Sequence, residues 1–349
     1  MNIYIFLIYL VFITLFFKDL ENKKLLILII LFPMFLSLAT QVNIGTDYKS
    51  YITIFNNLNS LEYSRIEIGY LAFNKFLRSF STNERILFVG VSFLQMILFY
   101  KILIEHQKIE LYKNIPLYIL IFCISTNGYI SMYNTLRSSI SALFFNLFIL
   151  FLLKKEFYKE LVVTVLGGSF HKSIYFSAFI VIFLKKILEK CYEKKVLISF
   201  FILCFFINRI DLIRKTSLFI YNLNLNIPYK EYLISEHMFP YGKSWGIGII
   251  VDFFICLFSI IFYKNYNKKN IFLYNLGIFL MGLELLFYGI PILSRFLEYF
   301  YICKGLIIYE TVKNSLEKKY YYIGWIILLF YFLRIYIGVQ RILIFNSNL

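Results

Sequence analysis

The chain has 349 residues, of which 60% are hydrophobic, 21% aromatic and 16% charged, and its mean hydropathy is +0.73. This composition excludes a soluble globular protein with an ordinary polar surface and predicts a polytopic integral membrane protein. The formal net charge of +16 comes mainly from lysines between apolar runs, so it indicates membrane topology and we infer no nucleic-acid partner from it.

Apolar runs separated by short lysine-bearing breaks recur along the whole chain. A straight membrane span needs roughly 20 residues, so the shorter runs must recruit flanking Lys and Tyr side chains or stop inside the protein. We expect an all-α bundle of about twelve transmembrane or re-entrant helices in a single membrane domain over 1–349. The candidate helices lie at 3–17, 25–40, 86–104, 115–133, 138–153, 161–170, 173–184, 196–210, 244–263, 271–290, 292–312 and 320–338.

The lysines between these runs predict the sides of the membrane. No basic residue precedes the first run and Lys18, Lys23 and Lys24 follow it, so it is predicted to be a retained helix with its amino terminus outside. Alternation then places the other lysine-rich breaks inside and two longer segments, 41–85 and 211–243, outside. In 41–85 the apolar residues recur at steps of three and four, which predicts amphipathic helices on the membrane face, whereas 211–243 is predicted to be a loop.

Arginine is distributed differently from lysine. All nine Arg residues of the chain fall outside or in the outward half of a predicted helix. Lysine is a hydrated point charge that suits loop topology, whereas the guanidinium fork binds pairs of phosphate or carboxylate oxygens and tolerates partial burial. The pattern indicates an anion-binding requirement on the outward side. The alternative is that these Arg residues pair with lipid headgroups or local acids.

The sequence contains no pattern for a metal or nucleotide site. The five Cys residues show neither metal-ligand spacing nor an outer pair that could form a disulfide. A Walker loop and an Asp-x-Asp pair are both missing, which weakens any hypothesis of a metal-held nucleotide substrate. We therefore predict no metal and no cofactor.

Two short motifs lie in the outer segment 41–85. In GTDYKSY, Asp47 can cap the following helix, with Tyr48 and Tyr51 on one of its faces. Capping alone would also explain Asp47. In EIGY, Glu67 and Tyr70 are three residues apart and therefore share a helical face.

A basic group opens the fifth predicted helix in the stretch NTLRSSISALF. Arg137 stands there at the outward start of the helix, with Ser138, Ser139 and Ser141 behind it. A guanidinium beside hydroxyls and a helix amino terminus can hold an anion. The alternative is that Arg137 extends to outer headgroups.

The stretch GGSFHKSIYF lies between two inner lysine clusters only about 30 residues apart. The chain must therefore go out and return within two short helices, and the turn between them is allowed at membrane depth only if it lines a cavity. His171 and Lys172 are at the tip of this turn. A lone His is usually structural, but a His beside Lys on an intramembrane turn favours a functional role.

Aromatic and amide side chains crowd the outer loop 211–243 and suit stacking on sugar rings. Asp252 and Glu284 follow within predicted helices. Beyond them, Arg295 in PILSRFLEYF stands at an outward helix start after Pro291, as a second basic group at a helix amino terminus.

In this order, GTDYKSY, EIGY, LRSSISALFF, SFHKSIYF and SRFLEYF resemble the motifs of the EpsG family, which is similar to the Wzy-type O-antigen and capsule polysaccharide polymerases. The resemblance implies a multi-pass protein of the bacterial inner (cytoplasmic) membrane with an active site toward the outer face. It implies a glycosyltransferase-type polymerase that joins oligosaccharide repeat units carried on polyprenyl diphosphate, such as undecaprenyl diphosphate, into O-antigen, capsule or exopolysaccharide.

The resemblance also implies the partners and the site residues. Donor and acceptor are lipid-linked oligosaccharides, reached through membrane lipid, and contact with a flippase and a chain-length regulator is expected. One departure is Ser138, where Gln is expected after the Arg. The family's motif residues carry over to Asp47, Tyr48, Tyr51, Glu67, Arg137, His171 and Arg295.

The expected reaction assigns roles to these groups. Arg137 and Arg295 would hold the lipid diphosphate, with Lys172, Tyr48, Tyr51 and Tyr70 as further binding residues. His171 has the unperturbed pKa closest to neutrality and is the candidate base, with Asp47 or Glu67 as its partner. Two other classes remain as alternatives: a flippase of lipid-linked oligosaccharide, which would need inward-facing charges as well, and a membrane acyltransferase, for which His171 lies on the wrong side.

Overall fold

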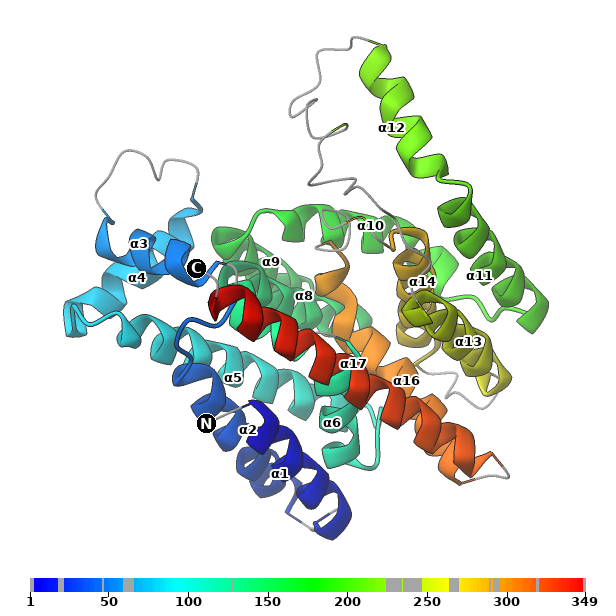
Figure 1. The fold of residues 1–349 in the computed structure, drawn as a ribbon, viewed down its shortest axis with the longest axis horizontal. Coiled ribbons are helices and arrows are strands. Elements are labelled where there is room, and N and C mark those ends of the chain that lie inside the picture. The colour runs from blue at the N-terminus through cyan, green and yellow to red at the C-terminus, as the bar shows by residue number, and fades with distance from the viewer. Residues whose placement is uncertain are drawn as a thin grey trace. The chain divides into compact units, whose positions relative to one another are not determined.

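The computed structural model describes residues 3–17, 22–45, 47–58, 66–126, 128–223, 234, 247–263, 270–288, 290, 296–317 and 320–347. Every regular element in these ranges is helical (Figure 1), so the all-α prediction is confirmed. Arg295 and most of the outer loop 211–243 lie outside the described residues.

Two compact units make up the chain. One contains Met1–Phe183 and Leu328–Leu349, and the other contains Leu184–Ile327; we call them the first and second unit. A single membrane domain over 1–349 stays a prediction.

The helices of the first unit hold four of the five sequence motifs. The long helices α5 and α8 pack against each other, α2 lies along α5, and α9 lies along α8 (Figure 1). The elements are α1 (Ile3–Phe16), α2 (Lys23–Ala39), α3 (Tyr48–Asn56), α4 (Ile68–Phe80), α5 (Arg85–Lys108), α6 (Ile115–Ser125), α7 (Gly128–Asn134), α8 (Leu136–Lys154), α9 (Phe157–Phe170) and the first part of α10 (Ser173–Leu188).

The second unit is built mainly from four helices that pack on one another. Helix α14 contacts both α11 and α16, and α13 contacts α11, α14 and α16. The elements are α11 (Lys194–Arg209), α12 (Leu212–Asn222), α13 (Ile247–Ile261), α14 (Ile271–Leu286), the 3₁₀ turn η5 (Glu298–Phe300), α16 (Tyr301–Leu316) and the start of α17 (Tyr321–Ser347). An ion pair between Lys304 Nζ and Glu284 Oε2, 2.6 Å apart, joins α16 to α14.

The expected number of about twelve spans is not confirmed. Among the described residues, only α5 and α8 are long and apolar enough by themselves to cross a membrane. If each of two bent helix pairs is counted as one span, the number of possible spans rises to four. Most of the other apolar helices have 17 residues or fewer, which is short of a straight span.

The two bent pairs correct the sequence prediction in detail. The run 115–133 was expected as one helix, but α6 and α7 meet at an angle of 60°. Residues 212–222, expected in a loop, form α12, which is bent by 58° from α11. Asp211 between them has a positive φ of 54°, and such a residue interrupts a right-handed helix, so the apolar pattern continues in a new direction.

Other predicted elements are confirmed. The segment 41–85 contains the two amphipathic helices α3 and α4, whereas its placement outside the membrane stays a prediction. The predicted break near His171 separates α9 from α10 by only two residues, His171 and Lys172.

Buried polar contacts fix the start of α8, where Arg137 stands. Gln95 on α5 donates to the carbonyl of Met132 at 3.2 Å and to Ser139 Oγ at 2.8 Å. Ser37 on α2 contacts the hydroxyls of Tyr129 and Tyr133 on α7. Because buried polar groups are costly unless they are paired, these contacts specify where α7 ends and α8 begins.

Helices α8 and α9 form a tight antiparallel pair. Lys155, which ends α8, has a φ of 58° and a left-handed conformation, and the chain enters α9 directly after Glu156. The first turn of α8 and the last turn of α9 therefore lie at the same end of the pair. This is how Arg137 and His171 come to share one region.

Candidate functional site

An ion pair between Glu67 and Arg137 forms the centre of the site. Arg137 Nη1 lies 2.6 Å from Glu67 Oε2, with side-chain exposures of 27% and 10%. Glu67 immediately precedes α4 in an extended conformation and makes no side-chain capping bond there, so its carboxylate is directed to a distant partner. The pair ties the start of α4 to the first turn of α8.

The second carboxylate oxygen of Glu67 reaches the turn between α9 and α10. The backbone N–H of Lys172 donates to Glu67 Oε1 at 3.4 Å. From α8, the Ser141 hydroxyl donates to the carbonyl of His171 at 3.1 Å. The backbone of the two-residue turn is therefore held from both sides, and Glu67 links it to Arg137.

His171 itself is partly buried and contacts Ser173, the first residue of α10, through Nδ1. The sequence predicts Asp47 or Glu67 as the partner of His171. In the structure Glu67 contacts the peptide group between His171 and Lys172, and the hydroxyl of Ser173 contacts Nδ1 of the imidazole. Ser173 belongs to the SFHKSIYF motif, but nothing in the sequence singles it out from the other serines.

Two tyrosines line the Arg137 side of the pair. The rings of Tyr51 on α3 and Tyr70 on α4 are 6.0 Å apart, edge to face, and the Arg137 guanidinium carbon lies 5.8 Å from the centre of the Tyr70 ring. Arg137 also lies close enough to Tyr51 to oppose the rise of its pKa. The two predicted binding tyrosines therefore meet the predicted anion-binding arginine.

Both tyrosines keep their protons near neutral pH. Burial raises the pKa of Tyr51 to about 12, with Asp47 adding to the rise and Arg137 opposing it. Burial also raises the pKa of Tyr70, and Tyr51 adds to the shift. Neutral phenols can donate hydrogen bonds but cannot act as bases, so proton abstraction at this site falls to another group.

Asp47 and Tyr48 occupy the start of α3. Asp47 precedes the helix but makes no side-chain capping bond, so the alternative that it serves only as a cap is not observed. The Tyr48 ring stacks on Phe88 of α5, with 4.8 Å between ring centres and an angle of 6°. This stacking anchors α3 on α5.

Two glycines allow the motifs to approach one another. Gly45 has a φ of +96°, and a Cβ there would lie 2.7 Å from Asn134 Oδ1 at the end of α7. A Cβ on Gly69 of EIGY would lie 2.1 Å from Ser169 Oγ and 2.7 Å from its carbonyl oxygen. Only glycine permits these contacts without displacing a neighbour, so α4 lies directly on the end of α9.

A sequence profile of the EpsG family matches residues 24–344. The chain belongs to the EpsG family. No curated protein and no solved structure matches it. Membership makes it a membrane protein related to polysaccharide biosynthesis, in agreement with its apolar helices. The match covers all five motifs that carried the resemblance, including the stretch with Arg295, whose position the structure does not describe.

The site of this EpsG-family protein gathers cationic, acidic and hydroxyl groups from four segments. Arg137 and Lys172 can bind an anion, Glu67 and Asp47 can accept hydrogen bonds from hydroxyls, and His171 can accept a proton. In the described residues, no three His, Cys, Asp or Glu side chains come close enough to hold a metal ion. The arrangement suits a substrate that carries both a phosphate group and sugar hydroxyls.

Proposed function

We propose that this EpsG-family protein is a polymerase that joins oligosaccharide repeat units carried on polyprenyl diphosphate at the outer face of the bacterial inner membrane. The observation that supports this most directly is the meeting of Glu67, Arg137 and the His171–Lys172 turn. These residues come from three of the family's motifs, far apart in the sequence. The growing chain would move from its lipid carrier onto the sugar of the next lipid-linked unit.

Arg137 is the proposed ligand of the donor's diphosphate. One terminal nitrogen of its guanidinium faces Glu67, while its buried Nε makes no hydrogen bond to the described residues. Glu67 holds the planar fork in one orientation, and the remaining N–H donors can meet phosphate oxygens in pairs. Lys172 is exposed in the turn whose backbone Glu67 contacts and would add a second cation, and Arg295 is the further arginine expected from the motif pattern.

The proposed step is a displacement at the anomeric carbon of the donor. The acceptor hydroxyl oxygen bonds to that carbon, the bond from carbon to the diphosphate oxygen breaks, and the diphosphate leaves with the electron pair. Arg137 stabilises the negative charge that develops on the leaving phosphate. The acceptor's proton passes to His171.

His171 suits the role of base in one of its two neutral tautomers, and the Ser173 hydroxyl can accommodate that tautomer because it can accept a hydrogen bond. If Nδ1–H donates to Ser173 Oγ, Nε2 carries the lone pair that accepts the substrate proton. Glu67 then acts as a positioning residue that fixes the backbone of the turn. Asp47 would orient the acceptor or stabilise positive charge at the anomeric carbon.

The experiment that tests the proposed function compares a deletion strain with the complemented strain. Lipid-linked oligosaccharides would be tested for accessibility from outside the intact cell and then extracted. A polymerase predicts loss of polymer and accumulation of single repeat units on the outer face. Accumulation on the inner face would instead assign the protein as a flippase and overturn the proposal.

A further inference from the structure

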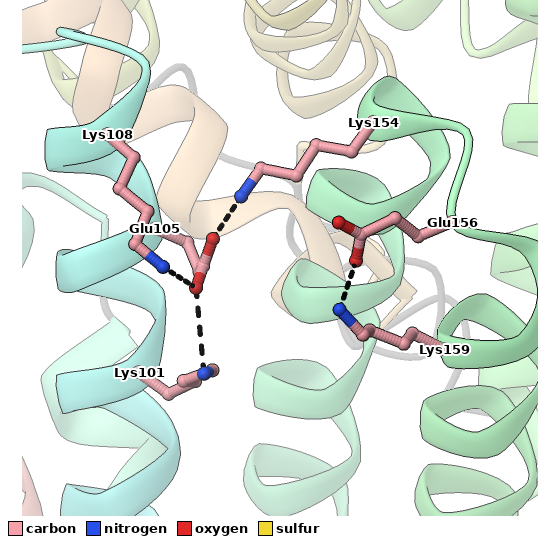
Figure 2. A network of polar contacts seen from close by, with 6 residues as sticks. All are labelled: Lys101, Glu105, Lys108, Lys154, Glu156 and Lys159. Carbon is pink, nitrogen blue, oxygen red and sulfur yellow. Dashed lines mark hydrogen bonds and ion pairs between the residues drawn. The ribbon is translucent and has the colours of Figure 1, made fainter.

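A second charged cluster lies at the other end of helices α8 and α9 from the candidate site. The carboxylate of Glu105 on α5 is buried, with 5% of its side chain exposed, and three lysine ammonium groups surround it (Figure 2). Lys108 lies 2.8 Å from Glu105 Oε1 and Lys101 lies 3.6 Å away, while Lys154 at the end of α8 contacts Oε2. We call these four residues the Glu105 cluster.

The charges of the Glu105 cluster do not balance. One carboxylate faces three ammonium groups, and the side chains of Lys101 and Lys108 remain 53% and 58% exposed. Next to them, Lys159 pairs with Glu156 at 2.8 Å (Figure 2), and Lys155 is exposed. The C-terminal ends of α5 and α8 therefore carry an excess of positive charge, and Glu105 holds three of the ammonium groups close together.

An apolar surface begins beside this charge. Along α9, beside the exposed Lys159, a stripe of apolar side chains recurs at steps of three and four, namely Tyr158, Leu161, Val162, Val165 and Leu166, and each is about half exposed or more. The stripe begins directly after Lys155 and continues toward the other end of α9. From Tyr158 to Leu166 the stripe is roughly 12 Å long at 1.5 Å per residue of helix.

We propose that the Glu105 cluster binds the phosphate of an acidic phospholipid whose acyl chains lie along the exposed apolar face of α9. Lysine stems can follow an apolar surface while their ammonium groups meet the headgroup phosphate. A soluble anion would use the charge but leave the apolar stripe uncovered. A zwitterionic lipid would cover the stripe but leave the excess charge unbalanced.

The placement gives this lipid a structural role that is separate from the proposed polymerase chemistry. Helix α8 carries Lys154 in its last turn and Arg137 in its first turn, roughly 26 Å apart by helix rise. A lipid that holds one end of the α8–α9 pair restricts the other end, where Arg137 and His171 lie. Lipid binding at the Glu105 cluster does not depend on the proposed reaction.

The test measures lipid binding by the purified full-length protein. Native mass spectrometry would count retained phosphatidylglycerol and phosphatidylcholine with the same acyl chains, added at equal concentrations in neutral detergent. The variant K101Q/K108Q removes the two exposed ammonium groups, and K185Q/K186Q in α10 removes the same charge elsewhere. Each lysine near a lipid surface contributes about fivefold to binding, so K101Q/K108Q should retain phosphatidylglycerol roughly 25-fold more weakly, with phosphatidylcholine and the control variant unchanged.

A second variant separates binding from folding. Glu105→Gln leaves three ammonium groups with no carboxylate, so the variant should unfold at a lower temperature in detergent than the wild type. Added phosphatidylglycerol should then raise the unfolding temperature of the variant more than that of the wild type. A structural cluster alone predicts no such rescue. Equal retention of both lipids by the wild type, unchanged phosphatidylglycerol retention in K101Q/K108Q, or equal binding of a short-chain phosphatidylglycerol would each overturn the proposal.

Discussion

Glu67 and Arg137 lie 70 positions apart in the chain, yet the carboxylate and the guanidinium meet at 2.6 Å. The pair joins the start of the amphipathic helix α4 to the first turn of the buried helix α8. The other carboxylate oxygen of Glu67 accepts a hydrogen bond from the backbone of the His171–Lys172 turn. One side chain therefore organises three of the family's motifs.

We expect Arg137→Lys to reduce polymer formation by roughly tenfold or more, because a lysine keeps the charge but loses the paired N–H donors, and a charge-assisted hydrogen bond contributes about 1.5–3 kcal/mol. Polymer ladders would be compared at matched membrane levels. Arg85→Lys, on an exposed arginine at the start of α5, is the matched control. Full-length polymer from Arg137→Lys would show that generic positive charge is sufficient there.

The Glu67–Arg137 pair should be visible as a coupling energy. Both side chains are mostly buried, so removing either one leaves the other without its partner, and we expect each single variant to lose about 2 kcal/mol of stability. A double-mutant cycle with Glu67→Ala and Arg137→Ala should give a coupling of at least about 1 kcal/mol in unfolding experiments. Additive losses would mean that the two side chains do not interact.

Gly69→Ala should destabilise the contact between α4 and α9, because the new Cβ would lie 2.7 Å from the Ser169 carbonyl oxygen. Forcing an extra methyl group into such a contact costs about 1–3 kcal/mol. Thermal unfolding and polymer formation would both be measured. Gly248→Ala, whose new Cβ would have its nearest neighbour at 3.5 Å, should leave both unchanged.

The role of His171 can be separated from that of its neighbours by three variants. We expect His171→Ala to abolish polymer ladders and to accumulate single lipid-linked repeats, because it removes the proton acceptor. Ser173→Ala should reduce the rate by a smaller factor, since it removes only the group that orients the ring. Near-normal ladders from His171→Ala would remove His171 from catalysis, and loss in Asp47→Asn alone would transfer the role to Asp47.

The predicted topology can be tested with single cysteines in a background without the five native ones. Asn59→Cys and Asn224→Cys lie in the segments predicted outside, and Lys155→Cys lies in a break predicted inside. An impermeant thiol reagent applied to intact spheroplasts should label the first two and spare the third. The opposite labelling would reverse the topology and move the candidate site to the inner face.

Much of the helical framework could be predicted from local patterns. The amphipathic period in 41–85 indicated α3 and α4, and the polar break at His171 and Lys172 marked the boundary of α9 and α10. Local patterns did not predict the places where a contiguous apolar run changes direction. The bends between α6 and α7 and between α11 and α12 depend on what each half packs against, which hydropathy does not report.

The sequence by itself determined that this is a helical membrane protein of the EpsG family, because composition, periodicity and motif order are local properties of the chain. Only the tertiary structure decided that Glu67 pairs with Arg137, that Ser173 contacts the His171 ring, and that Lys154 reaches Glu105. For each of these groups the sequence offers several possible partners and does not distinguish among them. The choice among them depends on helix packing and on glycine contacts such as that of Gly69 with Ser169, because a charged group buried in a low-dielectric interior is stable only beside the partner that packing places next to it.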